Sequence, residues 1–112
     1  MSKFNTFDVW NLVFGNKQEV KDYAGRLMKK LTCGNSHSAY HPTLDHIRPL
    51  SKGGADVLEN IIVCYRDTNE EKADNFPHWK VNSKRYKTTR VKGSRIAYKI
   101  FEDQKSSRNA KT

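Results

Sequence analysis

The sequence predicts a small α+β domain whose middle runs in the order strand, loop, strand, helix. Residues 43–47, TLDHI, and residues 60–66, NIIVCYR, are rich in the side chains typical of short strands. The loop between them, residues 48–59, contains one Pro and two Gly and lets the second strand return beside the first. A short helix is expected over residues 68–76, and a length of 112 residues fits a single domain.

Capping residues delimit the expected middle helix. Asp67 is the expected N-cap, and Glu70, three residues further, completes a capping box. The helix is therefore expected to start at Thr68 and to end before Pro77.

Two further helices are expected near the N-terminus. Thr6 is the expected N-cap of a helix over residues 7–14 that ends at Gly15, and Asn16 the expected N-cap of a second helix over residues 17–30. Apolar side chains at helical spacing are expected to face the core in both helices: Phe7, Trp10, Val13, Phe14, Val20, Tyr23, Ala24, Leu27 and Met28.

The C-terminal third is predicted to form a basic β-hairpin. Residues 85–91 and 95–102 flank a Lys-Gly-Ser turn, which favours two antiparallel strands. The alternative is a helix from Arg95 to Gln104. The last segment, residues 104–112, is expected to be a frayed tail.

The net charge of +9 lies entirely in this C-terminal third. Residues 1–78 contain ten Lys/Arg and ten Asp/Glu, whereas residues 79–112 contain eleven Lys/Arg and two Asp/Glu. Because nucleic acids release counterions to Lys and Arg, a basic segment beside a neutral one favours a nucleic-acid partner over a membrane. The predicted organisation is one domain over residues 1–112, with a core unit at about 42–77 and the basic element at 79–112.

The two cysteines, Cys33 and Cys64, cannot form a four-cysteine zinc site by themselves. The sequence shows no secretory leader and no apolar stretch of membrane-spanning length. Reduced thiols and a cytoplasmic location are therefore expected.

Four polar residues on the strand-loop-strand-helix frame fit phosphodiester hydrolysis: Asp45, His46, Asn60 and Asn69. The imidazole of His46 can accept a proton from water near neutral pH. The carboxylate of Asp45 and the amide oxygen of Asn69 are hard ligands that suit a divalent cation, with water and phosphate oxygens completing its shell. One carboxylate and one amide make a weak site, so the metal is expected to bind fully only with nucleic acid present.

The spacing of these residues resembles that of the HNH endonucleases of the ββα-metal superfamily. Counting from His46, Asn60 is 14 residues further on (60 − 46) and Asn69 is 23 further on (69 − 46). Residues 45–51 read DHIRPLS, and residues 72–77 read K-x-D-N-x-P, as in the HNH domain of RNA-guided CRISPR effector nucleases; phage HNH nucleases are also similar.

The resemblance implies a role for each matching residue. His46 is expected to be the general base, Asp45 and Asn69 the metal ligands, and Asn60 the residue that orients the histidine through nearby backbone. Lys72 and Asp74 match helix positions that are expected to brace the site. The implied reaction is metal-dependent cleavage of DNA that leaves 5′-phosphate and 3′-hydroxyl ends. Because side chains alternate along a strand, Asp45 and His46 can serve one metal only if the strand bends or ends there.

Mg²⁺ is the expected metal, with Mn²⁺ as an alternative, and no structural zinc is expected. The paired cysteines that hold zinc in many HNH proteins are missing, because Tyr65 and Thr68 stand at two of those positions. An alternative zinc set is Cys33, His37, His41 and Cys64.

The expected partner is double-stranded DNA rather than RNA. No interaction with a membrane is expected. Phosphate contacts are expected from Arg48, Lys52, Lys72, Lys84, Arg85, Lys87, Arg90 and Arg95. A catalytically silent nucleic-acid-binding module is the alternative function. A phage or bacterial role is expected, while sequence specificity and the choice between monomer and homodimer stay open.

Overall fold

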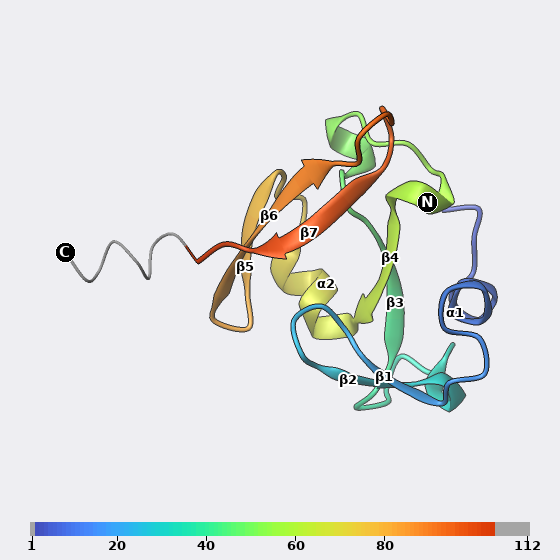
Figure 1. The fold of residues 1–112 in the computed structure, drawn as a ribbon. Coiled ribbons are helices and arrows are strands. Elements are labelled where there is room, and N and C mark those ends of the chain that lie inside the picture. The colour runs from blue at the N-terminus through green and yellow to red at the C-terminus, as the bar shows by residue number, and fades with distance from the viewer. Residues whose placement is uncertain (1, 105–112) are drawn as a thin grey trace.

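Residues 2–104, the part of the chain that the computed structural model describes, form two α-helices and three small antiparallel sheets (Figure 1). The mixed α+β class predicted from the sequence is confirmed. Within these residues no helix is long and apolar enough to cross a membrane.

The central unit confirms the predicted order of strand, loop, strand and helix. Strand β3 (Pro42–His46) pairs antiparallel with β4 (Ile61–Tyr65), and α2 (Arg66–Lys72) follows β4 directly. Short 3₁₀ turns at Leu50–Lys52 and Leu58–Asn60 shape the connecting loop.

The predicted start of α2 and its capping box are wrong. The helix begins two residues earlier than expected, after Tyr65, whose side chain makes no capping bond. Asp67 therefore lies inside the first turn, where its carboxylate accepts a bond from Arg66 at 3.1 Å. The predicted end before Pro77 is correct.

One N-terminal helix is confirmed, and the second is replaced by a hairpin. Helix α1 (Thr6–Phe14) has Asn5 rather than Thr6 as its N-cap, because the Asn5 side chain accepts the backbone N–H of Asp8. The expected helix over residues 17–30 is wrong, since this segment contains β1 (Glu19–Lys21) and β2 (Leu27–Lys29), paired antiparallel.

The turn between β1 and β2 explains this error. One carboxylate oxygen of Asp22 accepts the backbone N–H groups of Ala24 and Arg26, at 2.9 and 3.0 Å. Gly25 adopts φ +86°, which the absence of a side chain permits. The other oxygen of Asp22 accepts the N–H of Tyr65 at 2.9 Å, which fastens the hairpin to β4.

The predicted basic hairpin is confirmed as part of a three-stranded sheet. Strands β5 (His78–Val81), β6 (Lys84–Arg90) and β7 (Tyr98–Glu102) lie in chain order, each antiparallel to the next. The alternative helix from Arg95 to Gln104 is wrong. The prediction of a frayed tail falls on residues 105–112, outside the described residues.

Two apolar clusters pack on the two sides of the β3–β4 ribbon. Towards α1, the buried residues are Val9, Trp10, Met28, Val63 and Tyr65. Towards β5 and β6, they are Ala24, Ile47, Trp79, Val81 and Tyr86. The expected core positions Phe7 and Val13 are wrong, because both side chains are more than half exposed.

The Asp22→Ala variant should lose about 2–4 kcal/mol of unfolding free energy, because it leaves buried N–H groups without an acceptor. Urea unfolding followed by tryptophan fluorescence measures this loss. The matched control Asp67→Ala removes a largely exposed carboxylate and should cost about 1 kcal/mol or less. Equal losses in the two variants would contradict the assigned role of Asp22.

Candidate active site

The predicted catalytic pair lies at the end of β3, next to the loop that leads to β4. In the register of this ribbon Asp45 lies opposite Ile62, and His46 lies opposite Ile61. Asp45 faces α2, where it meets Lys72, while His46 faces the side on which Ile61 packs towards α1. The strand ends at His46, so the two side chains flank its last residues on opposite faces.

Asp45 is a buried carboxylate whose partners are incomplete. Its side chain is 12% exposed, and its Oδ2 lies 3.2 Å from the Nζ of Lys72. This oxygen is buried and accepts no aligned hydrogen bond from any described residue. Burial raises the pKa of the Asp45 carboxyl above its usual value, although the Lys72 cation opposes that rise.

Lys72 is a fully buried ammonium that links the site to the C-terminal sheet. Besides Asp45, its Nζ contacts the carbonyl oxygen of His46, to which it donates a hydrogen bond at 3.2 Å. It also lies 4.8 Å from the centre of the Trp79 ring, a favourable cation–π distance. The prediction that Lys72 contacts phosphate is wrong, because no part of this side chain reaches the surface.

Asn69 lies on α2 one turn before Lys72, on the same face of the helix. Its Nδ2 donates to the hydroxyl of Thr43 at 3.0 Å and to the carbonyl oxygen of Leu44 at 3.2 Å. These two bonds fix the amide, and its Oδ1 accepts no hydrogen bond from the described residues. The amide oxygen is therefore available to a ligand beside the end of β3.

His46 is held by a carboxylate that sequence reasoning missed. Its Nε2 lies 2.8 Å from Oδ1 of Asp56. The same carboxylate accepts the hydroxyl of Ser2 at 2.8 Å and the backbone N–H of Lys3 at 2.9 Å. These bonds, with that from His46 the largest, lower the pKa of Asp56 to about 2.

The ionised state of Asp56 determines the tautomer of the imidazole. A carboxylate can only accept, so Nε2 of His46 must carry the proton that it donates. In the neutral ring the lone pair then lies on Nδ1, which has no partner among the described residues. The only signal for Asp56 in the sequence is a carboxylate in the loop between His46 and Asn60, which does not distinguish it from Glu59.

Asn60 is completely buried, and its side chain bonds backbone groups at two places in the loop that follows β3. Its Oδ1 accepts the N–H of Arg48 at 2.9 Å, while its Nδ2 donates to the carbonyl oxygens of Arg48 and Ala55, at 3.0 and 2.9 Å. Its own carbonyl accepts the N–H of Ile47 at 2.8 Å. Asn60 therefore fixes the backbone that directly follows His46.

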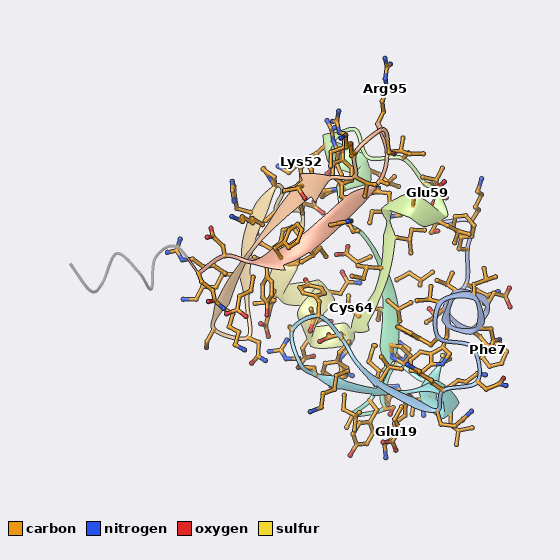
Figure 2. All side chains as sticks on the ribbon, in the orientation of Figure 1. Phe7, Glu19, Lys52, Glu59, Cys64 and Arg95 are labelled. Carbon is orange, nitrogen blue, oxygen red and sulfur yellow. The ribbon has the colours of Figure 1, made fainter. Side chains whose placement is uncertain are left out.

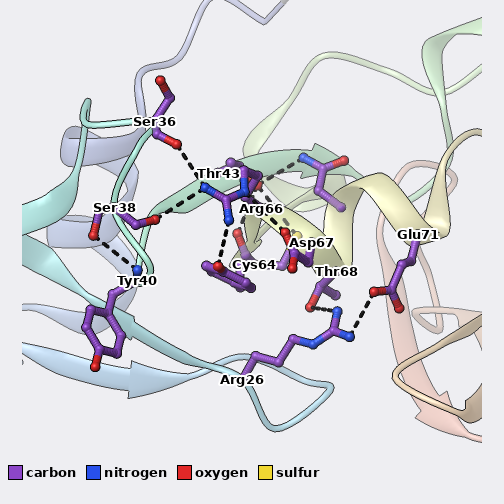
Figure 3. Close-up of polar contacts among 12 residues, drawn as sticks. Arg26, Ser36, Ser38, Tyr40, Thr43, Cys64, Arg66, Asp67, Thr68 and Glu71 are labelled. Carbon is purple, nitrogen blue, oxygen red and sulfur yellow. Dashed lines mark hydrogen bonds and ion pairs between the residues drawn. The ribbon is translucent and has the colours of Figure 1, made fainter.

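Two arginines hold α2 in place against the N-terminal half of the chain (Figure 3). Arg66 donates to the carbonyl oxygen of Ser36 at 2.9 Å. Arg26 donates to the hydroxyl of Thr68 at 3.3 Å and to the carboxylate of Glu71 at 2.8 Å. The helix that carries Asn69 is thereby tied to the segments on either side of β2.

The other predicted phosphate contacts lie at or near the surface. Lys52, Lys84, Arg85, Arg90 and Arg95 are exposed, and Arg48 and Lys87 are half-buried. Lys52 and Arg95 lie at the same end of the molecule, where the loop after β3 approaches the tip of the β6–β7 hairpin (Figure 2).

The alternative zinc set is not assembled. Among residues 2–104 no three His, Cys, Asp or Glu side chains gather in a way that could hold a metal ion. Cys64 is fully buried, and burial raises the pKa of its thiol far above the usual value. Burial also raises the pKa of the Cys33 thiol.

Asp45 and Asn69 carry the oxygen donors that could hold a divalent cation at this site. Asp45 has a buried oxygen that lacks a hydrogen bond, and Asn69 presents an amide oxygen that accepts none from its neighbours. Both are hard oxygen donors of the kind that Mg²⁺ prefers. The Lys72 ammonium already offsets part of the negative charge, so these two residues alone make a weak site.

Comparison with known proteins gives one match, to the central part of the chain. Residues 31–75 match the family model described as HNH endonuclease. Neither the search of curated proteins nor the search of solved structures found a match. The matched segment contains Asp45, His46, Asn60 and Asn69.

The Lys72→Met variant should lose about 3–5 kcal/mol of unfolding free energy, because it leaves the Asp45 carboxylate buried without its cation. The double variant Lys72→Met/Asp45→Asn should lose less than the sum of the single variants, because no buried charge remains. Urea unfolding of all three proteins measures the coupling.

The exposed residue Lys80 provides the control. Lys80→Met should change stability by about 0.5 kcal/mol or less. Additive losses in the double variant would show that Lys72 and Asp45 do not interact energetically.

Proposed function

The chain carries an HNH endonuclease domain at residues 31–75, and from that premise we propose that it hydrolyses phosphodiester bonds of DNA with His46 as the general base. One observation supports this role above the others: the bond from Nε2 to Asp56 leaves Nδ1 of His46 as the basic nitrogen. That nitrogen would take a proton from the attacking water.

The residues around His46 limit its motion. Asp56 holds the ring from one side, and Asn60 fixes the backbone that follows it. The Lys72 ammonium holds the carbonyl of His46 itself. Such positioning reduces the loss of entropy when water, base and phosphate come together in the reaction.

Asp45 and Asn69 would hold the divalent cation, most simply Mg²⁺. When bound, the cation neutralises charge on the phosphate and on the departing oxygen. Because the protein supplies few ligands, the metal is expected to bind fully only when DNA is present. Double-stranded DNA is the proposed substrate, and one such centre cuts one strand at a time.

A catalytically silent nucleic-acid-binding module is the second candidate. The position of the Lys72 ammonium, 3.2 Å from the Asp45 carboxylate, favours it, since this cation compensates charge that a metal would otherwise compensate. Such a module would bind DNA without cutting it.

Incubation of supercoiled plasmid with wild-type protein and Mg²⁺ or Mn²⁺ should produce nicked circles, visible on agarose gels. His46→Ala should lower the nicking rate by about 10²–10⁴-fold, because the base is lost. Asn69→Ala should also lower it and should raise the metal concentration needed for half-maximal rate. The exposed His78 provides the control, and His78→Ala should cut like wild type.

Intact plasmid with every divalent metal would reject the enzyme and favour the silent module. Nicking by His46→Ala at the wild-type rate would reject His46 as the base.

Asp56→Ala should lower the nicking rate at saturating DNA by about 10–100-fold, because the imidazole loses the group that fixes its orientation and tautomer. The DNA concentration at half-maximal rate should stay unchanged, and Asp56→Asn, which keeps an acceptor oxygen, should recover part of the rate. Glu59→Ala removes an exposed carboxylate from the same loop and is the matched control (Figure 2). Asp56→Ala with the rate of Glu59→Ala would contradict the positioning role.

A further inference from the structure

Two arginine side chains converge on one hydroxyl group beside the loop that follows His46. Arg48, in that loop, donates from Nη1 to the Tyr98 hydroxyl at 3.2 Å. Arg90 donates from Nη2 to the same hydroxyl at 3.5 Å. Arg90 and Tyr98 lie opposite each other in β6 and β7, so the contact joins the catalytic loop to the C-terminal hairpin.

The Arg48 guanidinium is held in place before any ligand arrives. Its Nε donates to the carbonyl oxygen of Lys52 at 2.8 Å, and its central carbon lies 5.7 Å from the centre of the Phe76 ring. The lack of a side chain at Gly53 leaves room for it, since a Cβ there would lie 3.2 Å from Nη2. Both backbone groups of Arg48 are bonded to the Asn60 side chain, so the backbone that carries this cation is held two residues after His46.

The charge of this pair is uncompensated within residues 2–104. The ion pairs there use Arg26, Lys29, His46, Arg66 and Lys72, and neither Arg48 nor Arg90 has a carboxylate partner. Two guanidinium groups at one neutral oxygen repel each other. The bond from Arg48, with a smaller contribution from Arg90, lowers the pKa of Tyr98, which shows that the surroundings favour negative charge there.

We propose that Arg48, Arg90 and Tyr98 form a binding site for one phosphate group of the DNA backbone, next to the phosphate that is attacked by the water activated by His46. This proposal rests on the proposed function. A phosphate offers several acceptor oxygens, which match two guanidinium groups and the hydroxyl proton of Tyr98. It also supplies the negative charge that the pair lacks.

Through this site the C-terminal hairpin would help to position the DNA strand. Phosphate contacts determine position and register without reading bases. Since Arg48 is two residues after the base and Arg90 is on the hairpin, a phosphate bound by both would place the strand relative to His46. The other exposed cations of the hairpin would attract DNA without fixing its position.

The test measures binding separately from cutting. Each variant is made in the His46→Ala protein, and binding of a short DNA duplex is followed by fluorescence anisotropy without divalent metal at several NaCl concentrations. Arg90→Gln should raise the dissociation constant about 10-fold and should reduce the salt slope by about 1. Tyr98→Phe should also weaken binding, because it removes the hydroxyl that both arginines share.

Arg95→Gln is the matched control, since Arg95 is exposed near the tip of the same hairpin and carries the same charge (Figure 2). Its dissociation constant should rise clearly less than that of Arg90→Gln. Arg48→Gln should resemble Arg90→Gln, and the exposed position of Arg90 keeps the test decisive even if Arg48→Gln disturbs the loop.

In the protein with His46 intact, Arg90→Gln should raise the DNA concentration at half-maximal nicking rate more than Arg95→Gln does, and the rate at saturating DNA should fall far less than in His46→Ala. Equal effects of Arg90→Gln and Arg95→Gln on binding would overturn the site. A saturated rate that falls as in His46→Ala would overturn the assignment to a neighbouring phosphate. Binding that follows the expected pattern in a protein that does not cut would support the site and reject only the proposed function.

Discussion

The ammonium group of Lys72 lies under the end of β3, where it touches three parts of the fold at once. It faces the carboxylate of Asp45, donates to the carbonyl of His46 and sits over the Trp79 ring. Removing two charges from water costs several kcal/mol per ion, and their mutual attraction repays that cost only in a fixed geometry. The contacts of Lys72 therefore fix the positions of α2, the end of β3 and the C-terminal sheet relative to one another. The side chains of the candidate site are held in place by the same contacts.

The loop between β3 and β4 is a rigid part of the site and more than a spacer. Asn60 makes three side-chain bonds to it, and Gly54 approaches so closely that a Cβ would lie 1.8 Å from the carbonyl oxygen of Arg48. Only glycine fits there. The two glycines thus act through close packing, one against the backbone and the other beneath the guanidinium of Arg48.

The sequence predicted well where residue spacing and strand propensity act together. The β3–β4–α2 unit and the C-terminal hairpin follow from local pattern, and the motif from Asp45 to Asn69 falls within the segment that matches the family model. The second N-terminal helix failed because the Asp22 carboxylate stabilises a turn through bonds to Ala24, Arg26 and the distant Tyr65. Periodicity in residues 17–30 cannot reveal a contact of that kind.

Long-range pairing also explains the errors within the candidate site. Lys72 was expected among the phosphate contacts, and nothing in its sequence neighbourhood predicts that Asp45 and Trp79 enclose it. Asp56 gave no signal because its partners, His46 and Ser2, are 10 and 54 residues away. Partners that the fold brings together from distant positions decide the protonation and burial of a site residue, and one sequence does not contain that information.

The bonds from Ser2 and Lys3 to Asp56 connect the first residues of the described structure to the candidate site. Ser2 and Lys3 bond the same carboxylate that holds the imidazole, so Ser2 is two hydrogen bonds away from His46 although the two are 44 residues apart in the sequence (46 − 2). A purification tag or a fused domain joined ahead of Ser2 would lie next to the bonds that hold the Asp56 carboxylate. A label for single-molecule work, or a fusion that directs the protein to a chosen DNA, is better placed away from Ser2 and Lys3.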